Sequence, residues 1–159
     1  MLTQAQAYEV AREHFNLRAW PEEWRTHPTV QRLLASPVPN AGISAPSHGG
    51  GRWIVFSDTF TAWVTLEQLY FVLGHEAGHT VHDHDSLGEG RTTEKEMEAD
   101  VWGFIACELA GVSMLHALTF LRLLQRMRIV LGYGPDPELW DRIEAGRAYI
   151  AERLLEQWP

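Results

Sequence analysis

Apolar residues recur at intervals of three and four along much of this chain, which is the spacing of one face of an α-helix. Residues 3–15 follow this spacing, and Thr3 with Gln6 reads as a capping box at the start of a short amphipathic helix. Thr65 and Gln68 repeat the same box before a strongly apolar run. The pattern predicts further helices at residues 29–34, 66–79, 113–131 and 137–158.

Between these helices the pattern changes. Residues 52–56 form a short β-rich run, and residues 60–64 alternate in a way that predicts a second strand. Residues 36–51 contain three prolines and four glycines, which predicts a loop that is either functional or a disordered excursion. The fold expected is therefore α+β and mainly helical, with a small β-sheet or hairpin before the helix at 66–79.

Composition narrows the class of protein. With 159 residues, 45% of them hydrophobic, the chain predicts one domain over residues 1–159. A net charge of −8 without a basic run argues against binding nucleic acid. The single cysteine, Cys107, cannot form an internal disulfide, and neither a signal peptide nor a membrane span is indicated. The expected location is the cytoplasm.

The candidate chemistry lies at His75-Glu76-Ala77-Gly78-His79. On a helix, two histidines four residues apart can bind the same zinc ion, so His75 and His79 are predicted metal ligands. Zinc held by three protein groups keeps a position for water and lowers the pKa of that water towards about 7. Glu76, next to the first ligand, is the predicted general base. The alternative is a chance match to the pattern in a helix without a metal.

A third ligand is needed, and the sequence offers several carboxylates. Asp85 stands where some zinc peptidases place it, but His82 occupies the position that requires a glycine for the necessary turn. Glu96 begins a stripe at helical spacing that continues through Asp100, with small residues after them, and this face could pack closely on the metal helix. Glu96 is therefore the predicted ligand, with Glu98 or Asp85 as its possible replacement.

Asp100, one turn after Glu96, is expected to accept a hydrogen bond from the second nitrogen of a ligand histidine. Alternatively, Thr93 and Glu96 form a capping box and these acids are ordinary residues of a first helical turn. His82 is expected to be a polar residue near the helix end, although it could also support the metal site.

The two motifs together, residues 75–79 and Glu96-Met97-Glu98-Ala99-Asp100, resemble the gluzincin metallopeptidases. The resemblance is greatest to HtpX-type and CAAX-processing proteases, whose second motif is Glu-x-x-Ala-Asp. It implies a zincin-like metallopeptidase domain that binds one Zn²⁺ through His75, His79 and Glu96. The chain is also similar to the ImmA/IrrE-type metallopeptidases, which are small and have a strand just before the metal helix. By this resemblance, an edge strand at residues 53–56 would pair with an extended substrate.

One position departs from the family pattern. Asp136 stands where a histidine often precedes the proline, and that histidine is thought to stabilise the oxyanion. Arg142, Tyr133 or a group from the loop at 36–51 could take its place.

Three functions compete. The favoured one is a zinc-dependent endopeptidase that acts on a peptide or protein. The second is a regulatory or toxin-linked metal-binding module that acts on one partner protein or is not catalytic, and the third is a zinc-free helical scaffold. The intact Glu76 favours the first, since a structural zinc site would not need it, while manganese or cobalt would also suit these ligands.

Overall fold

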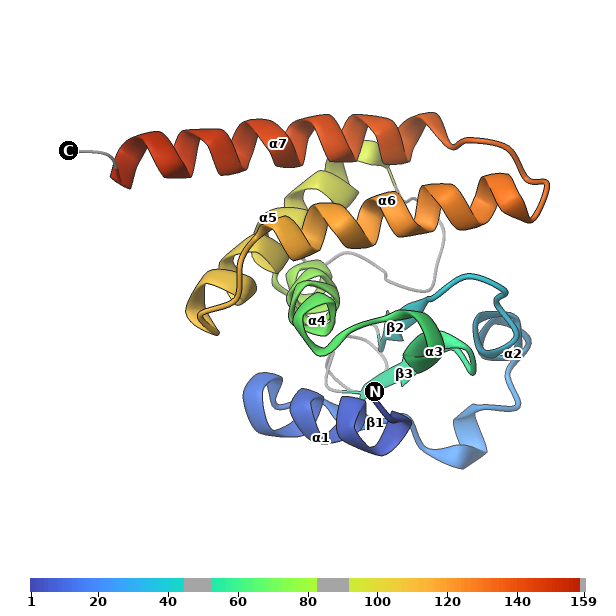
Figure 1. The fold of residues 1–159 in the computed structure, drawn as a ribbon. Helices are drawn as coiled ribbons and strands as arrows, with labels where there is room; N and C mark the ends of the chain where they lie inside the picture. The colour runs from blue at the N-terminus through green and yellow to red at the C-terminus, as the bar shows by residue number, and fades with distance from the viewer. Residues whose placement is uncertain (45–52, 83–91, 158–159) are drawn as a thin grey trace.

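Helix α4 (Leu66–Val81) lies at the centre of the protein and carries the histidine pair. The computed structural model describes residues 1–44, 53–82 and 92–157. Thr65 Oγ1 accepts a hydrogen bond from the backbone of Gln68, and Gln68 Oε1 accepts one from the backbone of Thr65, so the predicted capping box is confirmed. In Figure 1 this helix is seen almost end-on, with α5 (Thr93–Leu109), α6 (Leu115–Val130) and α7 (Pro137–Gln157) on one side. Helix α1 (Gln4–Phe15) and the sheet lie on the other side.

The sheet has three strands in the order β1-β3-β2. Strand β1 (Arg18–Ala19) runs parallel to β3 (Trp53–Phe56), whereas β2 (Ala41–Ile43) runs antiparallel to β3. A short 3-10 helix (Glu22–Trp24) and α2 (Pro28–Leu34) connect β1 to β2. The mainly helical α+β fold and the small sheet before the metal helix are therefore as predicted. Strand β3 has a neighbour on both sides, so the expectation that residues 53–56 form an edge strand is wrong.

Residues 60–64 do not form the predicted strand. They form a short helix, α3 (Phe60–Trp63), which ends at Val64. Phe60 and Val64 are both buried, but Ala62 between them is exposed, and Trp63 is 53% exposed. Phe60 and Val64 lie four residues apart, so a helical turn buries the pair as well as a strand would.

The predicted loop at residues 36–51 contains strand β2. Its pairing with β3 supplies backbone hydrogen bonds that a composition rich in proline and glycine does not reveal, and proline is tolerated beside an edge strand. His48 and residues 45–52 lie outside the described residues.

Helices α4 and α5 approach closely because glycines face the contact. A methyl group built on Gly74 would lie 2.5 Å from Cβ of Ala106 and 2.7 Å from the carbonyl oxygen of Trp102. On Gly78 it would lie 2.9 Å from Cβ of Trp102. Gly103 on α5 faces Phe71 of α4 with equally little space, so the close packing predicted for the small residues after Glu96 and Asp100 is confirmed. This packing brings Glu96 to the metal helix.

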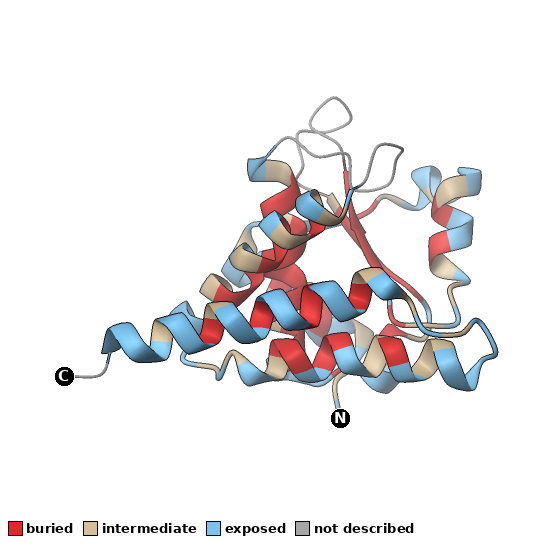
Figure 2. Ribbon diagram, turned by 90° about the horizontal axis from the view of Figure 1, so that it is seen from above, coloured by how far each residue is buried: buried red, intermediate tan, exposed pale blue. Residues whose placement is uncertain are grey.

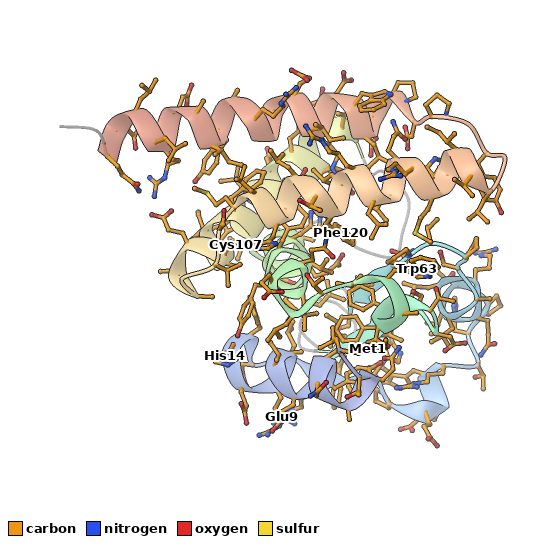
Figure 3. All side chains as sticks on the ribbon, viewed as in Figure 1. Met1, Glu9, His14, Trp63, Cys107 and Phe120 are labelled. Carbon is orange, nitrogen blue, oxygen red and sulfur yellow. The ribbon has the colours of Figure 1, made fainter. Side chains whose placement is uncertain are left out.

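Helices α6 and α7 each bury one face against the rest of the protein, as the alternation of buried and exposed residues in Figure 2 shows. Phe120 on α6 packs on Phe71 of α4, with ring centroids 5.9 Å apart. Glu9, in contrast, points away from the core on the outer side of α1 (Figure 3). Among the described residues, no helix combines the length and apolar character needed to cross a membrane.

Candidate metal centre

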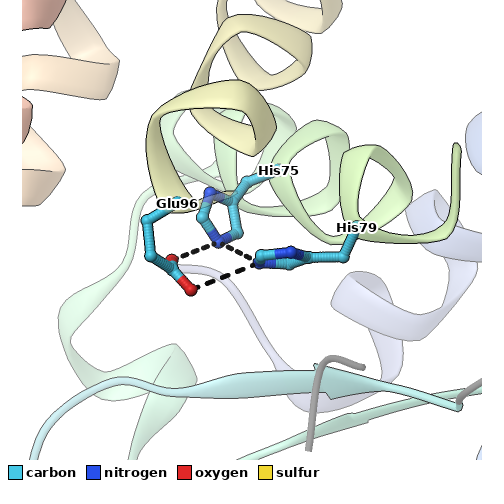
Figure 4. Close-up of side chains that lie close together, drawn as sticks. All are labelled: His75, His79 and Glu96. Carbon is cyan, nitrogen blue, oxygen red and sulfur yellow. Dashed lines mark hydrogen bonds and ion pairs between the residues drawn. The ribbon is translucent and has the colours of Figure 1, made fainter. Parts of the chain in front are cut away.

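The two histidines of α4 point the same ring nitrogen at a common position (Figure 4). Nε2 of His75 and Nε2 of His79 lie 3.0 Å apart, one helical turn from each other. Both side chains are buried, His79 completely. An imidazole pair held this closely in the interior is an arrangement suited to binding one ion.

Glu96 completes the group from the first turn of α5. Its Oε2 lies 3.3 Å from Nε2 of His75, and its Oε1 lies 3.6 Å from Nε2 of His79. One ligand atom from each of the three residues falls within 4.8 Å of the others. Because zinc–ligand bonds of 2.0–2.1 Å place tetrahedral ligand atoms about 3.3 Å apart, these residues fit a zinc ion.

Asp100 supports His75 from one turn further along α5. Its Oδ1 lies 2.8 Å from Nδ1 of His75, as predicted. A carboxylate can only accept, so Nδ1 carries the proton that it donates to Asp100, and Nε2 is the nitrogen that can bind a metal once it is deprotonated.

Arg142 of α7 ties the two carboxylates of α5 together. Its Nε and Nη2 donate to Oδ2 and Oδ1 of Asp100, each at 2.8 Å, and its Nη1 lies 3.5 Å from Oε2 of Glu96. Arg142 is 8% exposed. The sequence proposed Arg142 for the oxyanion, and the structure shows a bidentate pair with Asp100 that had not been foreseen, since the two residues are 42 positions apart.

The surroundings favour positive charge at the metal position. Burial would lower the pKa of His75, but hydrogen bonds to Asp100 and Glu96 outweigh it and raise that pKa to about 9. Burial would likewise raise the pKa of Asp100, but the charge and hydrogen bonds of Arg142, aided by His75, hold it below its usual range. Asp100 is therefore a carboxylate, and a cation at the metal position is electrostatically stabilised.

Glu76 lies beside the group on α4 and is buried, with Oε1 3.9 Å from Nε2 of His75. His75, Glu76, Glu96 and Arg142 all line a cavity of about 760 Å³. The predicted base and two of the predicted ligands therefore face a space large enough to receive part of a peptide.

The remaining candidates lie elsewhere. The side chain of Glu98 is 51% exposed and lies 3.7 Å from His82, not beside the two ligand histidines. His82 caps the end of α4 and accepts a hydrogen bond from Nε1 of Trp102, as expected for a polar residue at a helix end. Tyr133 is 61% exposed. Asp85 lies outside the described residues.

Taken together, the fold and the group of His75, His79 and Glu96 have the features of a metal-dependent hydrolase with a small α+β domain. Comparison with protein families matches residues 3–89, more than half of the chain, to Peptidase family M48. The protein belongs to this family of metallopeptidases. The match includes the histidine pair and Glu76 but ends before Glu96. No curated protein and no solved structure matches the chain.

Proposed function

We propose that this protein is a zinc-dependent endopeptidase in which His75, His79 and Glu96 bind one Zn²⁺ and Glu76 is the catalytic base. The observation that carries the proposal is the placement of Glu76 beside the three buried ligand candidates, at the wall of a cavity. A structural zinc site has no need for an acidic side chain beside its ligands or for an opening to a cavity.

Each residue of the site has a separate role in the proposed hydrolysis. Glu76 accepts a proton from the attacking water and passes it to the nitrogen of the leaving group. Asp100 holds the ring of His75 in the tautomer that presents Nε2, and Arg142 holds Asp100 and lies near Glu96. When bound, a zinc ion supplies Lewis acidity, which favours deprotonation of water and polarises a carbonyl group.

The substrate is proposed to be a peptide or protein that enters the cavity beside β2. Asn40 and Ala41 line that cavity, and β2 is the outer strand of the sheet next to it. Strand β2 is therefore better placed than β3 to lie along an extended peptide. The single-domain organisation, the cytoplasmic location and a regulatory protein partner stay predictions.

Arg142 is proposed to hold the metal ligands in place and not to bind the oxyanion. Its guanidinium already donates to both oxygens of Asp100. Donors committed to a buried carboxylate are poorly placed to follow charge that develops on a substrate.

The test compares wild-type protein with Glu76→Gln, both loaded with zinc. Cleavage of an unstructured protein such as casein is followed by mass spectrometry, and zinc content by elemental analysis. Glu76→Gln is expected to keep about one zinc per chain and to lose at least about 100-fold in cleavage rate. Glu67→Gln, an exposed residue of the same helix, is the matched control and should cleave normally. If wild-type protein binds zinc and cleaves no peptide bond, the protein is a metal-binding module without peptidase activity.

A further inference from the structure

The cavity at the candidate metal centre has walls from five parts of the chain. Helix α2 and the segment that leads from it to β2 contribute one part, α6 and the start of α7 contribute two more, and α4 and α5 contribute the residues of the metal centre. Its composition, and not only its size, indicates what it can receive.

Part of the wall of this cavity is apolar, among polar and charged side chains. Five large apolar side chains from three helices line it, and all but one of them are buried: Phe71, Val72, Phe120, Leu124 and Leu139. An apolar side chain of a ligand would bind favourably to this part of the wall, because binding removes apolar area of both partners from water.

The carboxylates on the cavity wall that do not belong to the metal centre are held by the protein itself. Oδ1 of Asp136 accepts a hydrogen bond from the backbone of Glu138 at the start of α7. Oε2 of Glu138 accepts one from Oγ1 of Thr93, and Glu138 also interacts with the charge of Arg142. These acids therefore have partners within the protein.

The two arginines on the wall that lie outside the metal centre differ from these acids. Within the described parts of the chain, neither Arg32 nor Arg128 has a carboxylate partner. Arg32 makes a hydrogen bond of 3.4 Å with Thr29, and the guanidinium of Arg128 lies 5.9 Å from the ring of Tyr133. Nε of Arg128 is buried and has no hydrogen-bond partner in the described structure. Arg128 is therefore a cation on the cavity wall that no carboxylate of the described residues neutralises, in a protein whose net charge is −8.

We propose that the cavity binds peptide segments that combine an apolar side chain with a neighbouring carboxylate, and that Arg128, assisted by Arg32, selects for the carboxylate. The inference rests on the proposed function and names the substrate class of the same site. An unpartnered guanidinium beside an apolar surface binds a carboxylate well, because charge-assisted hydrogen bonds are stronger than neutral ones. The carboxylate belongs to an aspartate or glutamate side chain, or to the C-terminus of the substrate.

The test measures binding, so that it does not depend on cleavage. Zinc-loaded Glu76→Gln protein is titrated against fluorescent peptides blocked at both ends, each with a Leu-Phe pair followed by Glu-Glu, Gln-Gln or Lys-Lys. A fourth peptide carries Gln-Gln and a free C-terminal carboxylate. We expect the Glu-Glu peptide to bind about tenfold more tightly than its blocked Gln-Gln counterpart, and the Lys-Lys peptide more weakly still. Tight binding of the fourth peptide identifies the terminal carboxylate as a ligand of the same subsite.

Charge reversal assigns the selectivity to a residue. Arg128→Glu, added to the Glu76→Gln protein, should abolish the preference for Glu-Glu, and Arg32→Glu should reduce it. Arg126→Glu is the matched control, because Arg126 is an exposed arginine of the same helix and does not line the cavity. Equal binding of the blocked Glu-Glu peptide, the blocked Gln-Gln peptide and the peptide with a free C-terminal carboxylate would overturn the proposal. An equal effect of the Arg126 and Arg128 changes would also overturn it.

Failure of this inference and failure of the proposed function are distinguishable. If wild-type protein cleaves peptides but shows no carboxylate preference in binding, the peptidase proposal stands and the specificity proposal is wrong. If the carboxylate preference depends on Arg128 and no peptide is cleaved, the cavity is a peptide-binding site of a protein without peptidase activity.

Discussion

Arg142 and Asp100 form a buried bidentate ion pair, in which Nε and Nη2 of the arginine each lie 2.8 Å from a different oxygen of the aspartate. Asp100 in turn accepts from Nδ1 of His75, so α7, α5 and α4 are joined by one chain of charged contacts. The orientation of His75, a predicted metal ligand, therefore depends on Arg142, which lies 67 positions later in the sequence.

Arg142→Gln is expected to lower the free energy of unfolding of the metal-free protein by about 3–5 kcal/mol, because it leaves the buried charge of Asp100 without its main partner. Urea denaturation followed by circular dichroism measures the change. The matched control is Arg147→Gln on the same helix, whose ion pair with Glu144 is largely exposed and should be worth less than about 1 kcal/mol. Equal stability of the two variants would contradict this account.

Gly74 is expected to tolerate no side chain. An alanine in the interior of a helix normally stabilises it by about 1 kcal/mol relative to glycine. Here the new methyl group would meet Cβ of Ala106 and the carbonyl oxygen of Trp102, and overpacking costs about 1–3 kcal/mol. Because one of these contacts is to backbone, we expect Gly74→Ala to lower the melting temperature and to weaken zinc binding, since it displaces α5 and Glu96. A rise in melting temperature would show that the helices are not packed this closely.

Cys107 is expected to be unreactive in the native protein. The side chain is fully buried in α5, and burial raises the pKa of its thiol to about 11. At neutral pH the thiol is therefore protonated as well as inaccessible. A thiol reagent such as dithionitrobenzoate should label the chain only after denaturation, to one thiol per chain. Rapid labelling of the native protein would contradict the packing of α5.

Local signals explain why much of the fold was predictable. The capping boxes of Thr3 with Gln6 and of Thr65 with Gln68 fix two helix starts within a few residues of sequence, and both are present. Phe60 and Val64 fit a strand and a helical turn equally well, so residues 60–64 were assigned wrongly. Strand β2 was missed because it exists through its pairing with β3, which is not a local property.

At the candidate site, too, local spacing was predictable and contacts between distant helices were not. Helical spacing alone brings His75 and His79 together, and it also distinguishes Glu96 from Glu98 once α5 packs on α4. The partnership of Arg142 with Asp100 depends on the position of α7, which no spacing within α5 reveals. The arginines that face the cavity were likewise not foreseen, because a single sequence does not show which exposed cations share a cavity.

The most direct test of the metal centre is a zinc titration of three proteins prepared free of metal: wild type, Glu96→Gln and Glu98→Gln. The two variants change the same functional group two residues apart on one helix, and only Glu96 lies beside the histidine pair. We expect about one zinc per chain in the wild type, unchanged affinity in Glu98→Gln, and at least about a 100-fold loss in Glu96→Gln, which removes a direct ligand. Full zinc affinity in Glu96→Gln would contradict the proposed ligand set and with it the account of this site.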